Sequence, residues 1–403
     1  MSERPLSRWI MAGYGVGSIG TGTFATVPGL LLLIYMTDTL GVPAALAGLG
    51  IFVPKLWDVV TDPFMGSISD RTESRFGRRR PYLLAGALSL PVCFALIFST
   101  PDLGSPMLAF AWVITAYILA ATAFTVFCVP YVAMPAEMSD DYHEATRLMA
   151  YRMALMTVGI LVAGAGAPML VKLGGGGQAG YKVMAWAIAA VLLVGLCGAF
   201  FGTRSAPFTA ADPAASAGPG LAAQLRLALR NRPFVVLLLA YALQLCAVGC
   251  LLASVPFFAK YIVAGDPEEM VTFLFVALVG PAIVTMPAWL WVSRRLGKTR
   301  AYAIALVIFM LATLTLWWSP GRPALWSVAV VTVMGMAYAA TQLFPFSMLP
   351  DTIAVDQAAT GRRREGIFTG IWTAVDKGGL ALGGFATGLI LEFSGFVERH
   401  GEA

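Results

Sequence analysis

Charge is scarce in this chain of 403 residues, because Asp, Glu, Lys and Arg together make up only 12% of it. Soluble domains carry about 25% charged residues, whereas 58% of the residues here are hydrophobic. The sequence contains no Ser/His/Asp set, no Walker loop and no polar stretch long enough to form a catalytic domain. We therefore expect a membrane protein, and we do not expect an enzyme.

Cysteine and histidine are also rare, which argues against a disulfide framework and against a metal centre. All five cysteines fall inside apolar runs, and Cys246 and Cys250 lie one helical turn apart, a poor geometry for a disulfide. The two histidines, His143 and His400, lie near no cysteine cluster. We expect no resident metal and no cofactor other than a coupling ion.

Long apolar runs recur along the whole chain, and each is long enough to cross a bilayer. Backbone polar groups must be paired inside lipid, so these runs are expected to be helices of an all-α polytopic protein. We predict eleven spans, at about 10–36, 43–68, 81–100, 107–134, 148–171, 182–202, 233–262, 271–292, 300–318, 324–350 and 366–392.

Arginine is concentrated on one side of the predicted membrane. It precedes span 1 and follows spans 2, 4, 6, 8 and 10, whereas the opposite side carries few basic residues. By the positive-inside rule, the N-terminus lies in the cytoplasm and the protein in the inner (plasma) membrane. The net charge of +5 then reflects topology, and no nucleic-acid partner is expected.

The two halves of the chain resemble each other. Span 4 ends in Val129-Pro-Tyr-Val-Ala-Met-Pro135, and span 10 ends in Phe344-Pro-Phe-Ser-Met-Leu-Pro350, with the same proline spacing. Residues 203–232 are rich in Ala, Pro, Ser and Gly at their start and read as a cytoplasmic linker. We predict bundles at 1–202 and 233–403, a duplicated transporter architecture that binds substrate between its halves.

Span 2 carries the strongest functional signal, because Lys55, Asp58 and Asp62 interrupt its apolar sequence. A charged side chain at the centre of a bilayer costs at least about 2.5–3.5 kcal/mol. Asp58, Thr61 and Asp62 line one face of a helix and offer hard oxygen ligands suited to Na⁺. The two carboxylates can equally share a proton, since close carboxylates disfavour double ionisation. A salt bridge to Lys55 or a brace between helices is the structural alternative.

Lys377 is a second charge deep in the membrane, in the middle of span 11 beside Asp376. An ammonium at that depth needs an anionic or carbonyl partner. The candidates are Asp58 and Asp62 in the other half, or a local pair with Asp376, although adjacent helical residues point apart.

Arg152 lies just inside span 5 and has two interpretations. It reaches a central cavity and a substrate oxygen, or it closes the cytoplasmic end by pairing with Glu137 or Asp140. Charges at the cytoplasmic ends of the spans are candidates for a gate: Asp70, Arg71, Arg78, Glu137 and Asp351.

Three motifs resemble the glycoside–pentoside–hexuronide:cation symporters of the major facilitator superfamily. They are KLWDVVTDPFMG at 55–66 with DRTESRFGRRRPY at 70–82, VPYVAMPAEMSDDYHEATRLMAYR at 129–152, and DKGG at 376–379. The resemblance implies a major facilitator fold of two pseudo-symmetric six-helix bundles that work by alternating access.

The resemblance also implies roles for individual residues. Asp58, Thr61 and Asp62, with Thr125, match cation-site positions, Lys377 matches a lysine that links cation and substrate, and Arg152 matches a substrate-side arginine. Lys55 is an additional candidate for coupling. The chain departs from the family where acidic sugar ligands are expected, at Gly22 and Cys128, and where a tryptophan is expected, near Val132.

We therefore expect a secondary active symporter that couples Na⁺ or H⁺ to a small organic solute, with a sugar or glycoside as first choice. A transporter of lysolipids or other amphiphiles, a proton-coupled exporter and a non-transporting membrane sensor are the alternatives. The eleven predicted spans are one fewer than the twelve of the family pattern. We expect a monomer, with self-association through the glycines of span 11 if a twelfth helix is absent.

Overall fold

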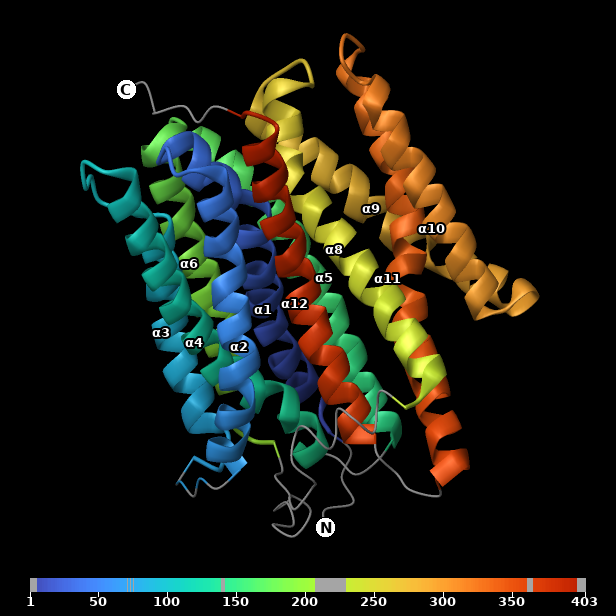
Figure 1. Ribbon diagram of the computed structural model, residues 1–403. Helices are drawn as coiled ribbons and strands as arrows, with labels where there is room; N and C mark the ends of the chain where they lie inside the picture. The colour runs from blue at the N-terminus through green and yellow to red at the C-terminus, as the bar shows by residue number, and fades with distance from the viewer. Residues whose placement is uncertain are drawn as a thin grey trace. The chain divides into compact units, whose positions relative to one another are not determined.

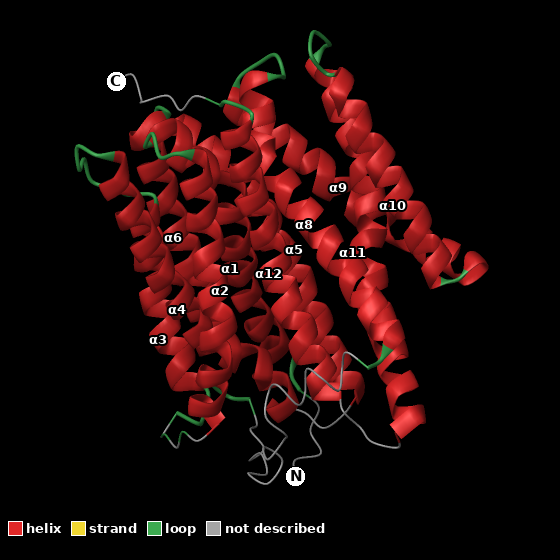
Figure 2. Ribbon diagram, in the orientation of Figure 1, coloured by secondary structure: helices red, strands yellow, loops and turns green. Residues whose placement is uncertain are grey.

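The computed structural model describes residues 6–70, 72, 74, 76–138, 142–206, 230–360 and 365–396 (Figures 1 and 2). Within these ranges the chain forms helices joined by short loops, and no strand occurs. The long helices are α1 (Arg8–Ile34), α2 (Ala44–Asp70), α3 (Arg80–Ile97), α4 (Pro106–Met138), α5 (Tyr142–Leu173), α6 (Gly177–Gly202), α8 (Arg232–Tyr261), α9 (Pro267–Leu296), α10 (Lys298–Thr315), α11 (Ala324–Thr360) and α12 (Glu365–Phe393). A π-helical turn, Tyr35–Thr39, extends α1, and a 3₁₀ turn, Leu316–Trp318, extends α10.

Eleven helices in the described part of the chain are long and apolar enough to cross a membrane. The prediction of eleven spans in an all-α, multi-pass membrane protein is therefore confirmed. The helices extend past the predicted spans mainly at their polar ends. For example, α11 continues to Thr360, ten residues beyond the proline expected to end span 10.

The chain divides into two compact units, which are described separately. Unit 1 comprises residues 1–214 and 384–403, and unit 2 comprises residues 215–383. The helix α12 contributes to both units, since its last ten residues, from Gly384 onward, cluster with unit 1. The division into bundles at 1–202 and 233–403 stays a prediction, and most of the predicted linker, residues 207–229, lies outside the described residues.

Within unit 1, α1 packs closely against α5 and α6. Glycines make this approach possible, since a Cβ at Gly13 would lie 2.6 Å from the Cα of Gly202 in α6. On the α5 side, a Cβ at Gly159 would lie 2.8 Å from the Cα of Ile19. Small residues at these positions let two membrane helices approach until their backbones touch, which maximises van der Waals contact in lipid.

Within unit 2, α8 packs against the first part of α12, and aromatic side chains fill the contact. Tyr241 and Trp372 stack with their ring centroids 4.2 Å apart, and Phe234 meets Phe368 edge to face at 4.8 Å. Farther along both helices, toward their C-terminal ends, α8 and α12 approach at Gly249 and Gly383, where an added Cβ would overlap the facing backbone.

The contact of α5 with α1 predicts a difference between two glycines of α5. Gly159→Ala forces a methyl group into the backbone of α1, whereas Gly166→Ala adds one where no heavy atom lies within 4 Å. Overpacking costs about 1–3 kcal/mol, so Gly159→Ala should lower the thermal unfolding temperature in detergent clearly more than Gly166→Ala. Equal unfolding temperatures for the two variants would show that the close approach is not a determinant of stability.

Candidate functional site

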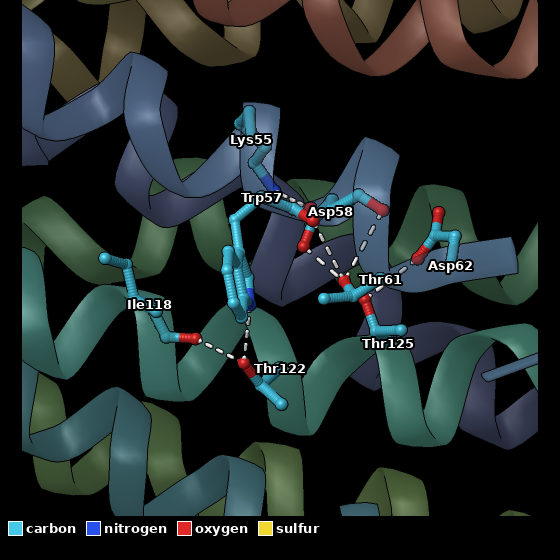
Figure 3. A network of polar contacts seen from close by, with 8 residues as sticks. All are labelled: Lys55, Trp57, Asp58, Thr61, Asp62, Ile118, Thr122 and Thr125. Carbon is cyan, nitrogen blue, oxygen red and sulfur yellow. Dashed lines mark hydrogen bonds and ion pairs between the residues drawn. The ribbon is translucent and has the colours of Figure 1, made fainter. Parts of the chain in front are cut away.

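The carboxylates of α2 lie in a segment bracketed by two prolines. Pro54 immediately precedes Lys55, and Pro63 immediately follows Asp62, yet the helix continues through both. Figure 3 shows that Trp57 and Asp62 of this segment reach Thr122 and Thr125 of α4. The side chain of Asp58 is completely buried, whereas Asp62 is partly buried. This segment therefore holds a carboxylate away from solvent within a membrane-spanning helix, as the sequence predicts.

Lys55 is the first partner of the buried carboxylate. Its Nζ lies 3.4 Å from Oδ2 of Asp58, and the lysine side chain is 19% exposed. Three aromatic rings surround the ammonium, with centroids 5.4 Å (Phe24), 5.8 Å (Tyr117) and 5.8 Å (Phe124) away. The faces of aromatic rings attract a cation, so this cage and the carboxylate both stabilise the charged lysine. The ion pair that the sequence allowed between Lys55 and Asp58 is present.

Thr125 of α4 joins the two carboxylates. Its hydroxyl donates a hydrogen bond to Oδ1 of Asp62 at 2.8 Å and lies 3.5 Å from Oδ1 of Asp58 (Figure 3). A hydroxyl has a single hydrogen, so the shorter contact is the stronger bond. The predicted grouping of Thr125 with Asp58 and Asp62 therefore has direct geometric support.

The hydroxyl of Thr61 has a different partner from the one expected of a cation ligand. It donates to the backbone carbonyl of Trp57 at 3.0 Å, a common arrangement for threonine within a helix. Its role as a ligand stays a prediction.

Sequence reasoning missed a second link between α2 and α4. The indole Nε1 of Trp57 donates to the hydroxyl of Thr122 at 3.0 Å, and this hydroxyl donates to the carbonyl of Ile118 at 2.8 Å. The link lies one turn of α4 before Thr125. It fixes the register of the two helices that supply the site, and only the three-dimensional pairing of the helices reveals it.

Lys55, Asp58 and Asp62 carry one positive and two negative formal charges, which sum to −1. One monovalent cation or one proton would neutralise this sum. Carboxylate and hydroxyl oxygens suit a hard cation, and Asp58, Asp62 and Thr125 provide them on one side of the cluster. Among the residues that the structure describes, no group of three or more His, Cys, Asp or Glu is arranged to hold a metal ion.

Arg152 belongs to a separate polar cluster of unit 1, where α1, α4 and α5 meet. Its guanidinium carbon lies 5.8 Å from the centroid of the Tyr131 ring, which stacks on Tyr14 at 4.5 Å. The Tyr131 hydroxyl donates to the carbonyl of Tyr14 at 2.6 Å and lies 2.7 Å from the hydroxyl of Ser18. The Nε of Arg152 is buried and has no hydrogen-bond partner within the described ranges.

Two positions at which the resemblance implies acidic sugar ligands hold no carboxylate here. Gly22 lies against α5, where a Cβ would stand 2.7 Å from the carbonyl oxygen of Met156. Cys128 is a partly buried thiol in α4 that forms no disulfide. Neither residue supplies the acidic acceptor that the resemblance implies at its position.

Lys377 and Asp376 lie in the part of α12 that belongs to unit 2. Asp376 accepts a hydrogen bond from the hydroxyl of Tyr241 at 2.5 Å, and Lys377 is partly buried. The carboxylates of α2 belong to unit 1. The expected link between Lys377 and these carboxylates therefore stays a prediction.

The predicted gate is only partly described. Asp351 forms an exposed ion pair with Lys298, with 2.6 Å between Oδ2 and Nζ. Arg78 is partly buried in the loop that follows α2. The side chains of Asp70, Arg71 and Glu137 lie outside the described residues, and so does the expected pairing of Arg152 with Glu137 or Asp140.

Comparison with known proteins identifies the family. A family model described as "MFS/sugar transport protein" matches residues 13–403. The chain belongs to this family. The resemblance to the glycoside–pentoside–hexuronide:cation symporters, inferred from the sequence motifs, is confirmed.

Relatives and solved structures agree with this assignment. An uncharacterized symporter of Synechocystis is 30% identical over 96% of this chain and 86% of its own length. A putative glycoside/cation symporter of Escherichia coli is 29% identical (94% and 82%), and a sodium-dependent lysophosphatidylcholine symporter of Danio rerio is 26% identical (98% and 79%). The crystal structure of a point mutant of the nucleoside transporter NupG has a TM-score of 0.65 at 13% identity and covers 96% of this chain and 91% of its own, which confirms the major facilitator fold.

The ion pair of Lys55 predicts strong coupling to Asp58. Removing one partner of a buried pair costs about 3–5 kcal/mol, because an uncompensated charge remains. Lys55→Met should therefore lower the unfolding temperature markedly, and Lys55→Met with Asp58→Asn should recover most of the loss. The control is Lys298→Met, because exposed pairs such as Lys298 with Asp351 contribute about 0–1 kcal/mol. Additive effects of Lys55→Met and Asp58→Asn in thermal unfolding would contradict the pairing.

Proposed function

We propose that this protein is a secondary active symporter that uses a Na⁺ or H⁺ gradient to accumulate a sugar or glycoside across the inner membrane by alternating access. One observation carries the proposal: Thr125 joins two carboxylates of a membrane-spanning helix beside a caged lysine. Burying such charge is expensive in lipid, and ionisable residues there mark ion pathways. Membership of a sugar-transporter family and relatives named as cation symporters support the same function.

In this proposal Asp58, Asp62 and Thr125 hold the cation. The sum of −1 over Lys55, Asp58 and Asp62 is then neutralised by one Na⁺ or one proton. When the cation leaves, Lys377 provides the compensating charge, which couples the occupancy of the site to the conformational cycle. The ammonium of Lys55 stays in its aromatic cage, paired with Asp58.

The cluster around Arg152 supports binding of an oxygen-rich solute. The guanidinium has a buried Nε without a partner within the described ranges, and the hydroxyls of Tyr131 and Ser18 lie nearby on α4 and α1. Arginine binds carboxylate oxygens in a planar, often bidentate geometry. A uronide therefore fits this cluster better than a neutral sugar, because acidic acceptors for hydroxyls are missing at Gly22 and Cys128.

A second candidate function is transport of an amphiphile such as a lysolipid. Unit 2 contains a groove of about 850 Å³, lined mainly by Leu, Phe, Val and Met side chains of α8, α9, α10 and α11. Such a surface accepts an acyl chain but offers few partners to a polyol. The relative from Danio rerio named as a lysophosphatidylcholine symporter supports this candidate.

The proposed coupling predicts that variants of the cation site lose gradient-driven accumulation of the solute but keep its exchange. In proteoliposomes, Asp58→Asn and Asp62→Asn should abolish gradient-driven accumulation of a radiolabelled glycoside, while exchange without a gradient survives at least in part. The control is Asp102→Asn, in the loop between α3 and α4, where the carboxylate of Asp102 accepts a hydrogen bond from the amide of Gly104 at 3.2 Å. This variant should accumulate the glycoside normally. Normal accumulation by both α2 variants would reject the cation site. Imposing Na⁺ and pH gradients separately identifies the coupling ion.

The proposed orientation predicts which loops a reagent outside the cell can reach. All five native cysteines lie within the membrane-spanning helices and not in loops, so the background labelling of intact cells should be low. Ser105→Cys, between α3 and α4, should react with a membrane-impermeant maleimide in intact cells. Ser74→Cys, between α2 and α3, should react only after the membrane is opened. The reverse pattern would place the N-terminus outside.

A further inference from the structure

An aromatic and acidic cluster in unit 2 has no role in the function proposed above. The hydroxyl of Tyr241 donates to Oδ1 of Asp376, and the Tyr241 ring stacks face to face on Trp372. Trp372 is 3% exposed, and its indole Nε1 has no hydrogen-bond partner among the residues described. The ring of Phe346 meets both aromatic rings edge to face, at 5.7 and 5.8 Å, and is 50% exposed. An accessible ring thus contacts both the tyrosine that bonds a partly buried carboxylate and the tryptophan whose indole donor is unused.

The internal repeat shows what this cluster corresponds to in unit 1. Gly159 of α5 lies against Ile19 of α1, and Gly383 of α12 lies against Cys246 of α8. The residue numbers differ by 227 between α1 and α8, and by 224 between α5 and α12. A second pair of contacts gives the same two differences: Gly22 with Met156 in unit 1, and Gly249 with Leu380 in unit 2.

Adding 227 to a residue number in α1 gives its counterpart in α8, and adding 224 to one in α5 gives its counterpart in α12. Tyr241 is then the counterpart of Tyr14, and Asp376 is the counterpart of Arg152. In each unit the charged group approaches an aromatic cluster that contains the counterpart tyrosine. The repeat therefore carries a cation at this position in unit 1 and an anion in unit 2.

The same correspondence includes the aromatic partner from the fourth helix of each unit. The prolines of α4 and α11 match with a difference of 215, as in Pro130 and Pro345. Phe346 is then the counterpart of Tyr131, and each ring contacts the counterpart tyrosine. Three positions on three helices thus match independently, so the cluster of Asp376 is the repeat of the cluster of Arg152.

The geometry points to a binding subsite for the hydroxyl groups of the transported solute, formed by Asp376, Trp372 and Phe346 and held by Tyr241. This inference rests on the proposed function. Tyr241 occupies one carboxylate oxygen, and the remaining acceptor capacity of Asp376 suits hydroxyl donors. The Nε1 of Trp372 offers a donor, and the exposed Phe346 ring offers an apolar surface for the C–H face of a pyranose.

The subsite supplies what unit 1 lacks. Gly22 and Cys128 provide no carboxylate, whereas Asp376 provides one on the opposite half of the repeat. A neutral glycoside then depends on Asp376. The solute class is accordingly a hydroxyl-rich pyranoside, with or without a carboxylate.

The test measures binding of two probes, 4-nitrophenyl β-D-glucopyranoside and 4-nitrophenyl β-D-glucuronide, to the purified full chain by titration calorimetry. Hydrogen bonds to a charged group are worth about tenfold or more in affinity. Asp376→Asn should therefore weaken binding of every probe that the parent protein binds by about tenfold or more, and Asp376→Glu should recover part of it. Arg152→Gln should weaken the glucuronide more than the glucopyranoside. The thermal shift produced by Na⁺ or by a pH change should stay the same in Asp376→Asn, because that group is not in the cation site.

Three results would overturn the subsite. Unchanged probe affinity in Asp376→Asn, when the parent protein binds, removes the residue from recognition and leaves the proposed function intact. Retained affinity with a lost cation response makes Asp376 a coupling group instead. Binding of neither probe by the parent protein, together with binding of a lysolipid, rejects both the subsite and the sugar assignment.

Discussion

The helix packing of unit 1 depends on how one buried charge, that of Asp58, is compensated. The carboxylate of Asp58 is completely buried in a membrane-spanning helix, where an unpaired charge would cost several kcal/mol. Lys55 of the same helix compensates it, and Thr125 of α4 lies 3.5 Å from its Oδ1. The requirement extends outward from there, since Lys55 in turn needs the rings of Phe24, Tyr117 and Phe124, which come from α1 and α4. The charge thereby fixes how three helices of unit 1 pack.

Hydropathy was sufficient to predict the helices, and spacing was sufficient to predict that Asp58 and Asp62 share a face. Both follow from local rules, namely the length of an apolar run and the period of a helix. The aromatic cage of Lys55 was not predictable, because its rings are up to 69 residues away along the chain, and nothing local marks them as partners. The same holds for Trp57 with Thr122, and for Tyr241 with Asp376, which are 135 residues apart.

Family resemblance assigned roles to single residues but could not describe their surroundings. Arg152 was expected near a substrate, and the structure adds Tyr14, Ser18 and Tyr131 around it. Asp376 was considered only as a local partner of Lys377. Its correspondence to Arg152 emerges only when the two helix pairs α1/α5 and α8/α12 are aligned residue by residue. The close glycine contacts provide this alignment, whereas hydropathy does not. The duplicated halves thus keep their helix packing while they differ in the charge that they present.

The prolines that bracket the charged segment of α2 have a mechanical consequence. Pro54 and Pro63 have no amide hydrogen, so the helical bonds to the carbonyls of Gly50 and Val59 cannot form. Residues 55–62 are therefore a short helical segment with one missing backbone hydrogen bond at each end. Bending of α2 is therefore easiest at these two positions, on either side of the segment that carries Lys55, Asp58 and Asp62.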